Sequence, residues 1–402
     1  MKRKSPLRKS KIIAGITGSV AAYKSVELIR RLRDYEADVT AVMTSASLRF
    51  ITPLSVELAC GKKPLTGLWD EPLAHIKTVE GASLFIIAPA TASTIAKLAN
   101  GIADDMLPAC YLAYTGKTII APAMNSNMYA HPAFRRNLER LEKDMGVITV
   151  GPQSGTLACG AQGPGRMAPV DEIIEAAEAA LTPKTLQGKK VLITAGPTRE
   201  YLDPVRFISN RSSGKMGYAL AKAAVARGAQ TLLVSGPCAL ARPQGLAGFV
   251  NAETTAEMKE AVLARAGDCH MLIMAAAPAD FTPAKRSGDK LQRQGGLNLR
   301  LDPTEDILAA VSAMKGKKKK PCLIGFAAGT GPDLSMAHRK LKAKGLDMIV
   351  FNDVLREGAG FDCDTNAVVI IGGAREAESP VMHKDDIAAF ILEKAIEKIW
   401  KA

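Results

Sequence analysis

The sequence predicts an α/β protein made of two tandem doubly wound, Rossmann-like domains. Short apolar runs alternate with amphipathic stretches along most of the 402 residues, which is typical of parallel sheets covered by helices. Both halves open alike, at residues 11–19 and 189–198, with lysine, an apolar run, threonine and a turn of small residues. With 47% apolar and 23% charged residues, the chain is long enough for two cores and lies outside the disordered class.

The first half contains five apolar runs that we expect to form strands. Helical patterns separate most of them, so successive strands should lie parallel in one sheet. The expected strands are residues 11–17, 38–43, 84–88, 118–121 and 147–150. The amphipathic stretch "VDEIIEAAEAAL" follows as a helix, and we expect this domain to span residues 11–181.

A break in the pattern marks the boundary between the halves. The segment "TPKTLQG" at 182–188 carries proline, glycine and hydroxyl residues with no period, which is typical of a linker. The second domain is expected to span residues 189–402 and to begin with the strand in "KKVLITAGPT". Its further expected strands are residues 231–234, 271–274, 322–325, 348–351 and 367–371.

The net charge of +13 is concentrated in two short segments. Six of the 53 basic residues fall in residues 2–11 and five in residues 315–320. Without them, 42 bases face 40 acids, so the folded body is nearly neutral. No aromatic interleaving or nucleic-acid motif accompanies either run. We therefore expect a basic disordered tail at residues 1–10 and no nucleic-acid partner, although a nucleic-acid arm is the alternative.

Cysteine usage and hydropathy exclude several other classes. The seven cysteines are odd in number and contain no C-x-x-C pair, so neither a disulfide framework nor a zinc site is indicated. No apolar run reaches the roughly 18 residues of a membrane span, and the start "MKRKSPLRKSK" does not lead into a secretory apolar segment. We expect a cytoplasmic protein without a membrane partner.

Polar residues follow three expected strands of the first domain. The turn "GITGSVAAYK" at 15–24 offers hydroxyls and backbone N–H groups to a phosphate, although a tight packing turn explains it equally well. The segments 88–107 and 121–132 each place hydroxyl or amide side chains at a helix start, for which ordinary N-capping is the alternative. Three such ends on one sheet edge favour a phosphorylated planar cofactor.

Longer motifs carry a family resemblance. "PATAST", "KLANGIADDML", "PAMN" and "ACGAQGPGRM" resemble the flavin-dependent cysteine decarboxylases. "AGPTRE", "DPVRFISNRSSGKMG" and "GFAAGT" are similar to phosphopantothenate–cysteine ligase. Their order matches the bifunctional bacterial enzymes of coenzyme A synthesis, which fuse phosphopantothenoylcysteine decarboxylase to that ligase. The resemblance covers nearly the whole chain beyond its basic start.

For the first domain, the resemblance implies FMN-dependent decarboxylation of 4'-phosphopantothenoylcysteine to 4'-phosphopantetheine. Cys159, in a glycine-rich loop over the substrate, would supply a proton late in the reaction; a structural cysteine is the alternative. His75 would act as a base or bind the substrate carboxylate, unless it is an ordinary core or surface histidine. Asn125 would hydrogen-bond that carboxylate. The residues implied to hold FMN are Gly18, Ser19, Thr44, Thr91, Thr94 and Met124.

For the second domain, the resemblance implies ligation of 4'-phosphopantothenate with cysteine, driven by CTP and Mg²⁺ through an acyl-cytidylate. Lys290, Lys340 and Lys344 would bind the triphosphate, and Asp280 would bind the metal and the nucleotide. The residues implied to bind nucleotide or phosphopantothenate are Arg206, Asn210, Asp280, Lys290, Thr304, Glu305, Asp306, Ile307, Phe326, Lys340 and Lys344. Asn210 and Lys290 are the catalytic candidates among them. We expect a homo-oligomer, as in the family.

Three departures from the family pattern leave alternatives open. The chain reads "KLQR" at 290–293 where the family commonly has "KIKK", and Gly329 stands where a glutamate is usual. Ala161 replaces the more usual acidic residue after "ACG". The alternatives are a flavoprotein decarboxylase with a degenerate ligase half, and a non-catalytic flavin- or nucleotide-binding regulator of the same fold.

Overall fold

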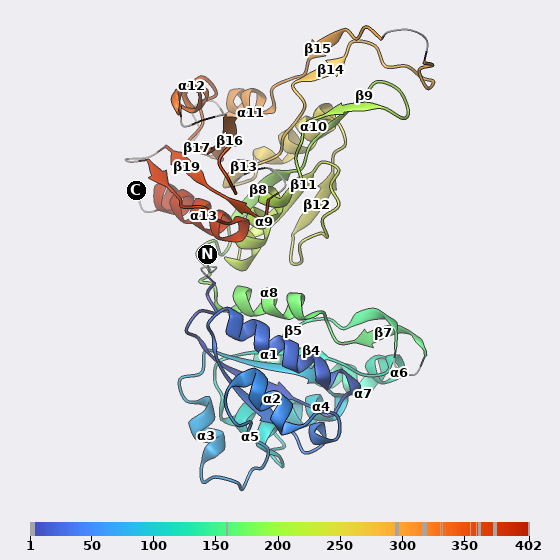
Figure 1. Cartoon of the computed structure of the whole chain (residues 1–402), viewed down its shortest axis with the longest axis vertical. Coiled ribbons are helices and arrows are strands. Elements are labelled where there is room, and N and C mark those ends of the chain that lie inside the picture. Colours follow the sequence, from blue (N-terminus) through green and yellow to red (C-terminus); the bar gives the residue numbers. More distant parts are fainter. Residues whose placement is uncertain are drawn as a thin grey trace. The chain divides into compact units, whose positions relative to one another are not determined.

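The computed structural model divides the chain into two compact units, one ending at Thr182 and the other beginning at Pro183 (Figure 1). It describes residues 5–157, 160–293, 297–315, 320–329, 331, 333–353, 355–358, 360, 363–372 and 376–400. The expected linker largely belongs to the second unit. Leu186 is fully buried in that unit's core, and its N–H donates to the carbonyl of Arg227 at 2.9 Å.

The first unit is built on a five-stranded parallel sheet with the strand order β2-β1-β3-β4-β5. Every strand lies where an apolar run predicts one, with ends that differ by at most two residues. β-strands buried on both faces need continuous apolar sequence, which is why these runs are legible. The strands are β1 (Lys11–Ile16), β2 (Asp38–Met43), β3 (Leu84–Ala90), β4 (Lys117–Pro122) and β5 (Ile148–Thr149).

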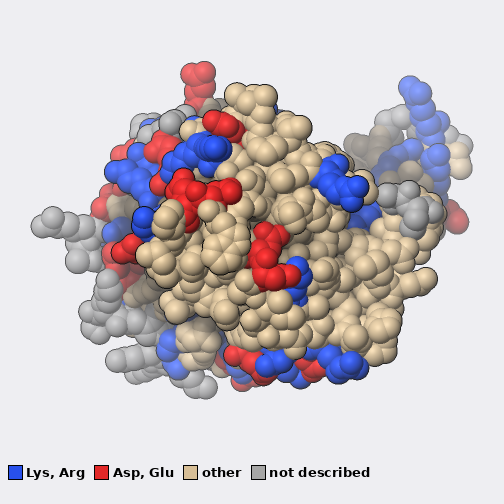
Figure 2. Space-filling view, turned by 90° about the horizontal axis from the view of Figure 1, so that it is seen from below, with Lys and Arg blue, Asp and Glu red and all other residues tan. Residues whose placement is uncertain are grey.

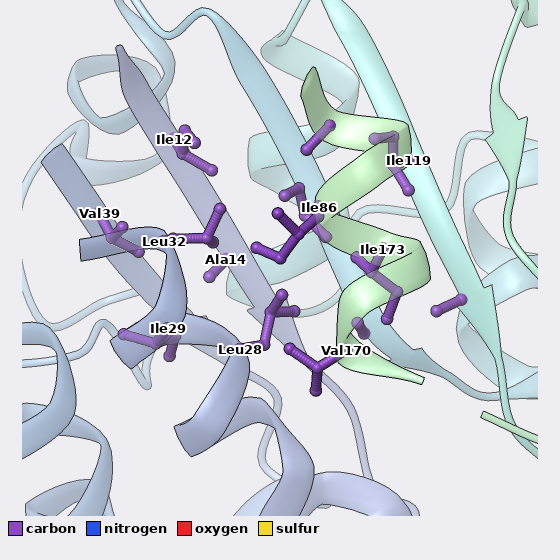
Figure 3. Packing of buried hydrophobic residues seen from close by; sticks show 14 of the residues in the cluster. Ile12, Ala14, Leu28, Ile29, Leu32, Val39, Ile86, Ile119, Val170 and Ile173 are labelled. Carbon is purple, nitrogen blue, oxygen red and sulfur yellow. The ribbon is translucent and has the colours of Figure 1, made fainter. Parts of the chain in front are cut away.

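Helices cover both faces of this sheet. Leu28, Ile29 and Leu32 of α1 and Ile173 of α8 pack on one face (Figure 3). Helices α3, α4, α5 and α7 contribute the buried side chains of the other face. The helices are η1 (Val20–Tyr23), α1 (Lys24–Asp34), η2 (Ser47–Arg49), α2 (Pro53–Cys60), α3 (Ala74–Val79), α4 (Ala92–Asn100), α5 (Met106–Ala113), α6 (Ser126–Ala130), α7 (Pro132–Met145) and α8 (Val170–Leu181).

The glycine-rich segment expected to be a loop contains a strand. β6 (Gln153–Thr156) and β7 (Gln162–Arg166) pair as an antiparallel hairpin. Gly163 and Gly165 both have φ of 150°, a conformation that other residues rarely adopt. The hairpin therefore depends on glycine backbone rather than on alternating side chains, so periodicity did not reveal it.

The prediction of a disordered tail is wrong for residues 5–10. Leu7 is fully buried in the core of the first unit. The Ser5 hydroxyl donates to Glu178 Oε1 at 2.6 Å, and the Ser10 hydroxyl donates to the Leu7 carbonyl at 2.6 Å. Burial of Leu7 and the bond from Ser5 dock this segment on the first unit despite its basic residues.

The second unit contains an eight-stranded sheet with the order β12-β11-β8-β13-β16-β17-β19-β20. The pairs from β12 to β17 are parallel, whereas β19 and β20 join in antiparallel fashion. Its strands are β8 (Lys190–Ala195), β11 (Gln230–Ser235), β12 (Gly248–Asn251), β13 (Met271–Met274), β16 (Cys322–Gly329), β17 (Met348–Asp353), β19 (Val368–Ile371) and β20 (Ala377–Glu378). The sequence did not indicate β12, β20 or the antiparallel edge.

Two helices, α9 and α13, cover one face of this sheet, and α10, α11 and α12 cover the other. Their bounds are α9 (Lys215–Ala226), α10 (Thr255–Ala266), α11 (Ile307–Lys315), α12 (Ser335–Ala343) and α13 (Lys384–Trp400). Short two-stranded ribbons complete the unit: β9 (Arg199–Tyr201) with β10 (Phe207–Ser209), β14 (Phe281–Pro283) with β15 (Leu301–Pro303), and β18 (Thr365–Asn366) with β21 (Met382–His383). None of the described helices is long and apolar enough to cross a membrane.

Burial of Leu7 makes a measurable prediction for stability. We expect Leu7→Ala to lower the free energy of unfolding of the first unit by about 2–5 kcal/mol, because it leaves a cavity in a closed core. Arg8→Ala is the matched control. Its salt bridge to Glu36 is surface-exposed, so its loss should cost less than about 1 kcal/mol. Differential scanning calorimetry of the full chain measures both, and equal effects would contradict the burial of Leu7.

Candidate active sites

Each sheet has one point where the strand order reverses, and the connections there leave in opposite directions. In the first unit this switch point lies between β1 and β3, and in the second it lies between β8 and β13. Ligands of open α/β sheets bind outside the carboxyl ends of the strands at such points. Both places are therefore candidate sites, and the expected functional residues can be located relative to them.

Thr17 closes the first switch point. Its side chain is fully buried, its hydroxyl donates to the Pro89 carbonyl at 2.8 Å, and it accepts from the Thr91 N–H at 3.1 Å. The Ser25 hydroxyl, also buried, donates to the Ala88 carbonyl at 2.7 Å. These bonds fix the segment after β3 against the end of β1.

Five of the residues implied to hold FMN gather around this point. Ser19 caps η1 and Thr91 caps α4, where it accepts from the Thr94 N–H at 3.3 Å. The Thr44 N–H donates to the Ile16 carbonyl at 3.0 Å, which places Thr44 at the same sheet edge. A Cβ at Gly18 would lie 2.6 Å from the Cβ of Ala46, so only glycine allows the two turns to touch.

The hairpin β6–β7 packs against the segment that follows β4. The Met124 N–H donates to the Gly165 carbonyl at 3.0 Å, and Asn125 caps α6 by accepting from the Asn127 N–H at 2.8 Å. The Ser126 Oγ is buried and, in the described part of the chain, has no hydrogen-bond partner. A Cβ at Gly163 would lie 2.7 Å from that oxygen. Cys159 lies outside the described residues.

His75 is the second residue of α3, and its neighbour Ala74 is buried against the opposite face of the sheet from α1. Within the ranges that the structure describes, no hydrogen bond or ion pair joins the His75 side chain to Asn125 or to the FMN candidates.

The second switch point is closed by a network around residues 277–280. The Ala279 N–H donates to the Thr198 hydroxyl at 2.8 Å, and the Thr304 hydroxyl donates to the Ala279 carbonyl at 2.7 Å. The Asn210 amide donates to the Pro278 carbonyl at 2.7 Å. Asn210 and Thr304, both expected from the sequence, thus meet at the segment that leads to the exposed Asp280.

Four charged residues form a cluster beside this segment. Lys344 pairs with Asp306 at 2.6 Å, and the Lys340 ammonium donates to the Phe326 carbonyl at 2.7 Å. Burial and the charge of Lys344 lower the pKa of Lys340, and Asp306 and Asp280 oppose this shift. Burial raises the pKa of Asp306, but hydrogen bonds from Lys344 and backbone N–H groups outweigh it and lower that pKa. Two ammonium groups and two carboxylates are thus gathered beside the second switch point.

Two of the remaining candidates, Arg206 and Glu305, make side-chain contacts near the second switch point. Arg206 Nη1 donates to the Leu291 carbonyl at 3.1 Å, which links Arg206 to the segment of Lys290. Glu305 pairs with Lys259 at the approach to α11. Ile307 is the first residue of α11, and its side chain is buried in the core. In the described ranges, no group of three or more His, Cys, Asp or Glu residues is arranged to hold a metal.

The aromatic ring of Phe351 packs closely against Gly329. The two residues lie on neighbouring strands, and a Cβ at 329 would stand 2.5 Å from Cε2 of that ring. Phe351 is itself buried in the core. The ring therefore occupies the space that the first atoms of a glutamate at this position would need.

Sequence reasoning missed the structural role of the residues that hold the sites together, although the hydroxyls of the turn at 15–24, Thr17 among them, were expected to face a phosphate. Thr17, Thr198 and Asp203 are each fully buried and bonded across a switch point or turn. A threonine soon after the first strand of each half was visible in the repeated opening pattern. Asp203 was visible as the start of "DPVR", an aspartate followed by proline that favours a turn.

The fold, two Rossmann-like α/β units with candidate sites at their switch points, agrees with the comparisons with known proteins. The family model described as "Flavoprotein" matches residues 1–182, and the model described as "DNA/pantothenate metabolism flavoprotein C-terminal domain" matches residues 186–399. The chain is 44% identical to the coenzyme A biosynthesis bifunctional protein CoaBC of Bacillus subtilis (strain 168), over 96% of this chain and 97% of that protein.

Further comparisons give the same family. The protein of that name from Escherichia coli (strain K12) is 40% identical over 96% of this chain and 97% of its own length. A crystal structure of the C-terminal domain of CoaBC is 38% identical, covers 55% of this chain and 100% of that chain, and gives a TM-score of 0.47. The chain belongs to the family of coenzyme A biosynthesis bifunctional proteins, which confirms the resemblance drawn from its motifs.

The contact between Gly329 and Phe351 predicts a coupled pair. We expect Gly329→Ala to destabilise the second unit by about 1–3 kcal/mol through overpacking. Gly267→Ala is the matched control, because a Cβ there meets nothing within 4 Å. In a double-mutant cycle with Phe351→Leu, the combined loss should be at least about 0.5 kcal/mol smaller than the sum. Calorimetric unfolding measures all four proteins, and additive losses would contradict the contact.

Proposed function

We propose that this bifunctional enzyme of coenzyme A biosynthesis performs its two reactions at its two switch points. The second unit ligates 4'-phosphopantothenate with cysteine, and the first unit decarboxylates the product, 4'-phosphopantothenoylcysteine, to 4'-phosphopantetheine. The observation that carries the proposal is the contrast between the sites. Hydroxyl and amide groups gather at both points, and the second adds the cluster of Lys340, Lys344 and Asp306.

The residues at the first switch point fit FMN. Ser19, Thr91 and Thr94 offer hydroxyls at helix starts, a donor set that suits a phosphate. The close approach of Gly18 to Ala46 brings two backbone turns together at the same edge. Gly18, Ser19, Thr44, Thr91 and Thr94 would hold the phosphate and its chain, and Met124 would lie at the ring. When bound, FMN supplies an electron acceptor for the substrate carbon that carries the thiol.

The chain's own residues position the substrate and move protons. Asn125 orients the substrate carboxylate with a neutral amide, which stabilises that ionised group less than a cation would. The hairpin β6–β7, bonded to Met124 through Gly165, excludes water from this place. The Cys159 thiol donates a proton to the enethiolate left after CO₂ departs. His75 serves as the base or as a second partner of the carboxylate.

The second switch point fits a nucleoside triphosphate. Lys340 and Lys344 lie one turn apart at the end of α12, so both ammonium groups can reach one triphosphate. An incoming phosphate would offset the burial that lowers the pKa of Lys340. CTP is the triphosphate proposed, with its base near Phe326. Mg²⁺ is usually held by one or two carboxylates together with substrate phosphates, a role that Asp280 can fill.

Activation and transfer involve the segment around Asn210. CTP converts the phosphopantothenate carboxylate into an acyl-cytidylate with release of pyrophosphate, and the cysteine amine then displaces CMP. Lys290 stabilises the charge that develops on the triphosphate. Arg206 binds phosphopantothenate, and Asn210, anchored to the Pro278 carbonyl, contacts the acyl-cytidylate.

We expect a homo-oligomer, and the surface around His75 supports this. His75 is flanked by Leu73 and Ile76, whose side chains are 60% and 49% exposed. Trp69 and Leu112 on nearby segments are 91% and 60% exposed, and Figure 2 shows a broad face with few charged residues. Large exposed apolar surfaces mark interaction sites. Assembly of copies through this region would bring His75 to a neighbouring chain. The cytoplasmic location stays a prediction.

Turnover of the purified full chain tests the proposal. With CTP, Mg²⁺, 4'-phosphopantothenate and cysteine, we expect release of pyrophosphate and CO₂ and formation of 4'-phosphopantetheine, from a protein with flavin absorbance. Asn210→Asp should impair ligation and leave decarboxylation of supplied 4'-phosphopantothenoylcysteine unchanged. Decarboxylation without pyrophosphate release would indicate a degenerate ligase half. Flavin or nucleotide binding without either reaction would indicate a regulator.

The roles of Cys159 and His75 predict two different blocks. Cys159→Ala should bind substrate, bleach the flavin and release CO₂, and then stall, because the late proton donor is missing. His75→Asn should leave the flavin oxidised and release no CO₂. Cys363→Ala, in the second unit, is the matched control and should decarboxylate normally. Anaerobic mixing with 4'-phosphopantothenoylcysteine, followed by absorbance and CO₂ detection, separates them. Normal turnover by Cys159→Ala would make that cysteine structural.

A further inference from the structure

Asp203 is a fully buried carboxylate in the turn between β9 and β10. Its Oδ1 accepts from the N–H groups of Val205 and Arg206, both at 2.7 Å. Its Oδ2 accepts from the Leu291 N–H at 3.1 Å and from Arg206 Nη1 at 3.3 Å. Two oxygens thus serve four donors, two of which come from outside the local turn backbone.

The bond from the Leu291 N–H to Asp203 Oδ2 joins two residues that are 88 positions apart in the sequence. Arg206 Nη1 completes it by donating to the Leu291 carbonyl at 3.1 Å, so both backbone polar groups of Leu291 are held. The Ser287 N–H also donates to the Leu202 carbonyl at 2.9 Å. Residues 287–291 are therefore hydrogen-bonded at both ends to the segment between β9 and β10. Lys290 is the exposed residue just before Leu291.

The Lys290 ammonium group forms no hydrogen bond or ion pair with any other residue that the structure describes. A long flexible side chain loses rotamer freedom when it binds a phosphate, so the backbone from which it projects must be fixed for binding to be efficient. The bonds of Leu291 supply that fixed backbone.

We propose that Asp203 is a positioning residue for ligation: it holds the backbone of Lys290 in place through Leu291 and sets the Arg206 guanidinium beside it. The inference rests on the proposed role of Lys290 in cytidylate formation. One carboxylate thereby fixes the relative placement of a residue for the nucleotide and a residue for phosphopantothenate. Asp203 touches neither substrate and acts only through these two neighbours.

A carboxylate suits this position better than an amide. All four partners are donors, and the NH₂ group of an asparagine would face one pair of them. Burial raises the pKa of Asp203, but the backbone N–H donors and the charge of Arg206 outweigh it and lower that pKa. The group therefore stays ionised and keeps both oxygens as acceptors at neutral pH.

The test variant is Asp203→Ser in the full chain. A serine hydroxyl can still accept from the N–H groups of Val205 and Arg206 and keep the turn, but it cannot reach Leu291. Asp268→Asn, an exposed carboxylate remote from the site, is the control. We expect the pyrophosphate burst without cysteine to slow roughly 10- to 100-fold. KM for 4'-phosphopantothenate should rise because Arg206 is displaced, kcat should fall because Lys290 is displaced, and decarboxylation should be normal.

A double mutant with Lys290→Gln separates positioning from a general structural role. At saturating 4'-phosphopantothenate, where the part that Arg206 plays in binding does not limit the rate, the double mutant should be no slower than Lys290→Gln alone within about twofold. Amide exchange of residues 287–293 should accelerate in Asp203→Ser while β8 and β13 stay protected. Three results would each overturn the inference. They are a double mutant whose rate loss is the product of the two single losses, an Asp203→Ser burst as fast as that of Asp268→Asn, and loss of amide protection across the whole second unit.

The proposed function has its own point of failure. A normal burst in Lys290→Gln would remove Lys290 from cytidylate formation, whatever Asp203→Ser does. A slow burst in Lys290→Gln together with a normal burst in Asp203→Ser would leave the proposed function intact and overturn only the positioning role. Asp203→Asn provides a second variant of nearly unchanged volume. The NH₂ group of the asparagine would face an N–H donor, so this variant should also slow the burst. Full activity would contradict the requirement for two acceptor oxygens at position 203.

Discussion

A buried threonine hydroxyl closes each switch point, and the placement of both candidate sites depends on these bonds. Where the strand order of a parallel sheet reverses, the connections diverge and leave backbone groups without partners. A buried polar group without a partner costs about 1–3 kcal/mol. Thr17 and Thr198, both fully buried, satisfy such groups by bonding to Thr91 and Ala279. These bonds lie at the carboxyl ends of the strands, where ligands of such sheets bind.

The two units use this arrangement for different chemistry. Decarboxylation needs an oriented carboxylate and a nearby electron acceptor, and the first site offers hydroxyls and the Asn125 amide. Acyl activation needs compensation for phosphate charge, and the second site offers Lys340 and Lys344 against Asp306. Neither the strand orders nor the sheet sizes decide this difference. It arises from the side chains placed after each strand, as expected for folds that host many functions.

Apolar runs made most of the central strands predictable, because a strand buried on both faces leaves no room for polar residues. The short half-exposed strand β12 and the ribbon of β9 with β10 carry no such run and were missed. The hydroxyl and amide candidates were predictable from their positions after strands. The role of Asp203 was not, because it depends on Leu291, whose proximity only the folded chain creates. Leu7 was misjudged because its basic neighbours dominated the composition.

The close fit of Phe351 around Gly329 has a consequence for which residues this fold accepts there. A side chain at 329 and the ring at 351 would occupy the same space, so a larger residue at 329 requires a change at 351. Introducing the glutamate expected from the family resemblance would therefore have to begin at position 351. Position 329 is thus restricted by packing, whatever its effect on the reaction itself.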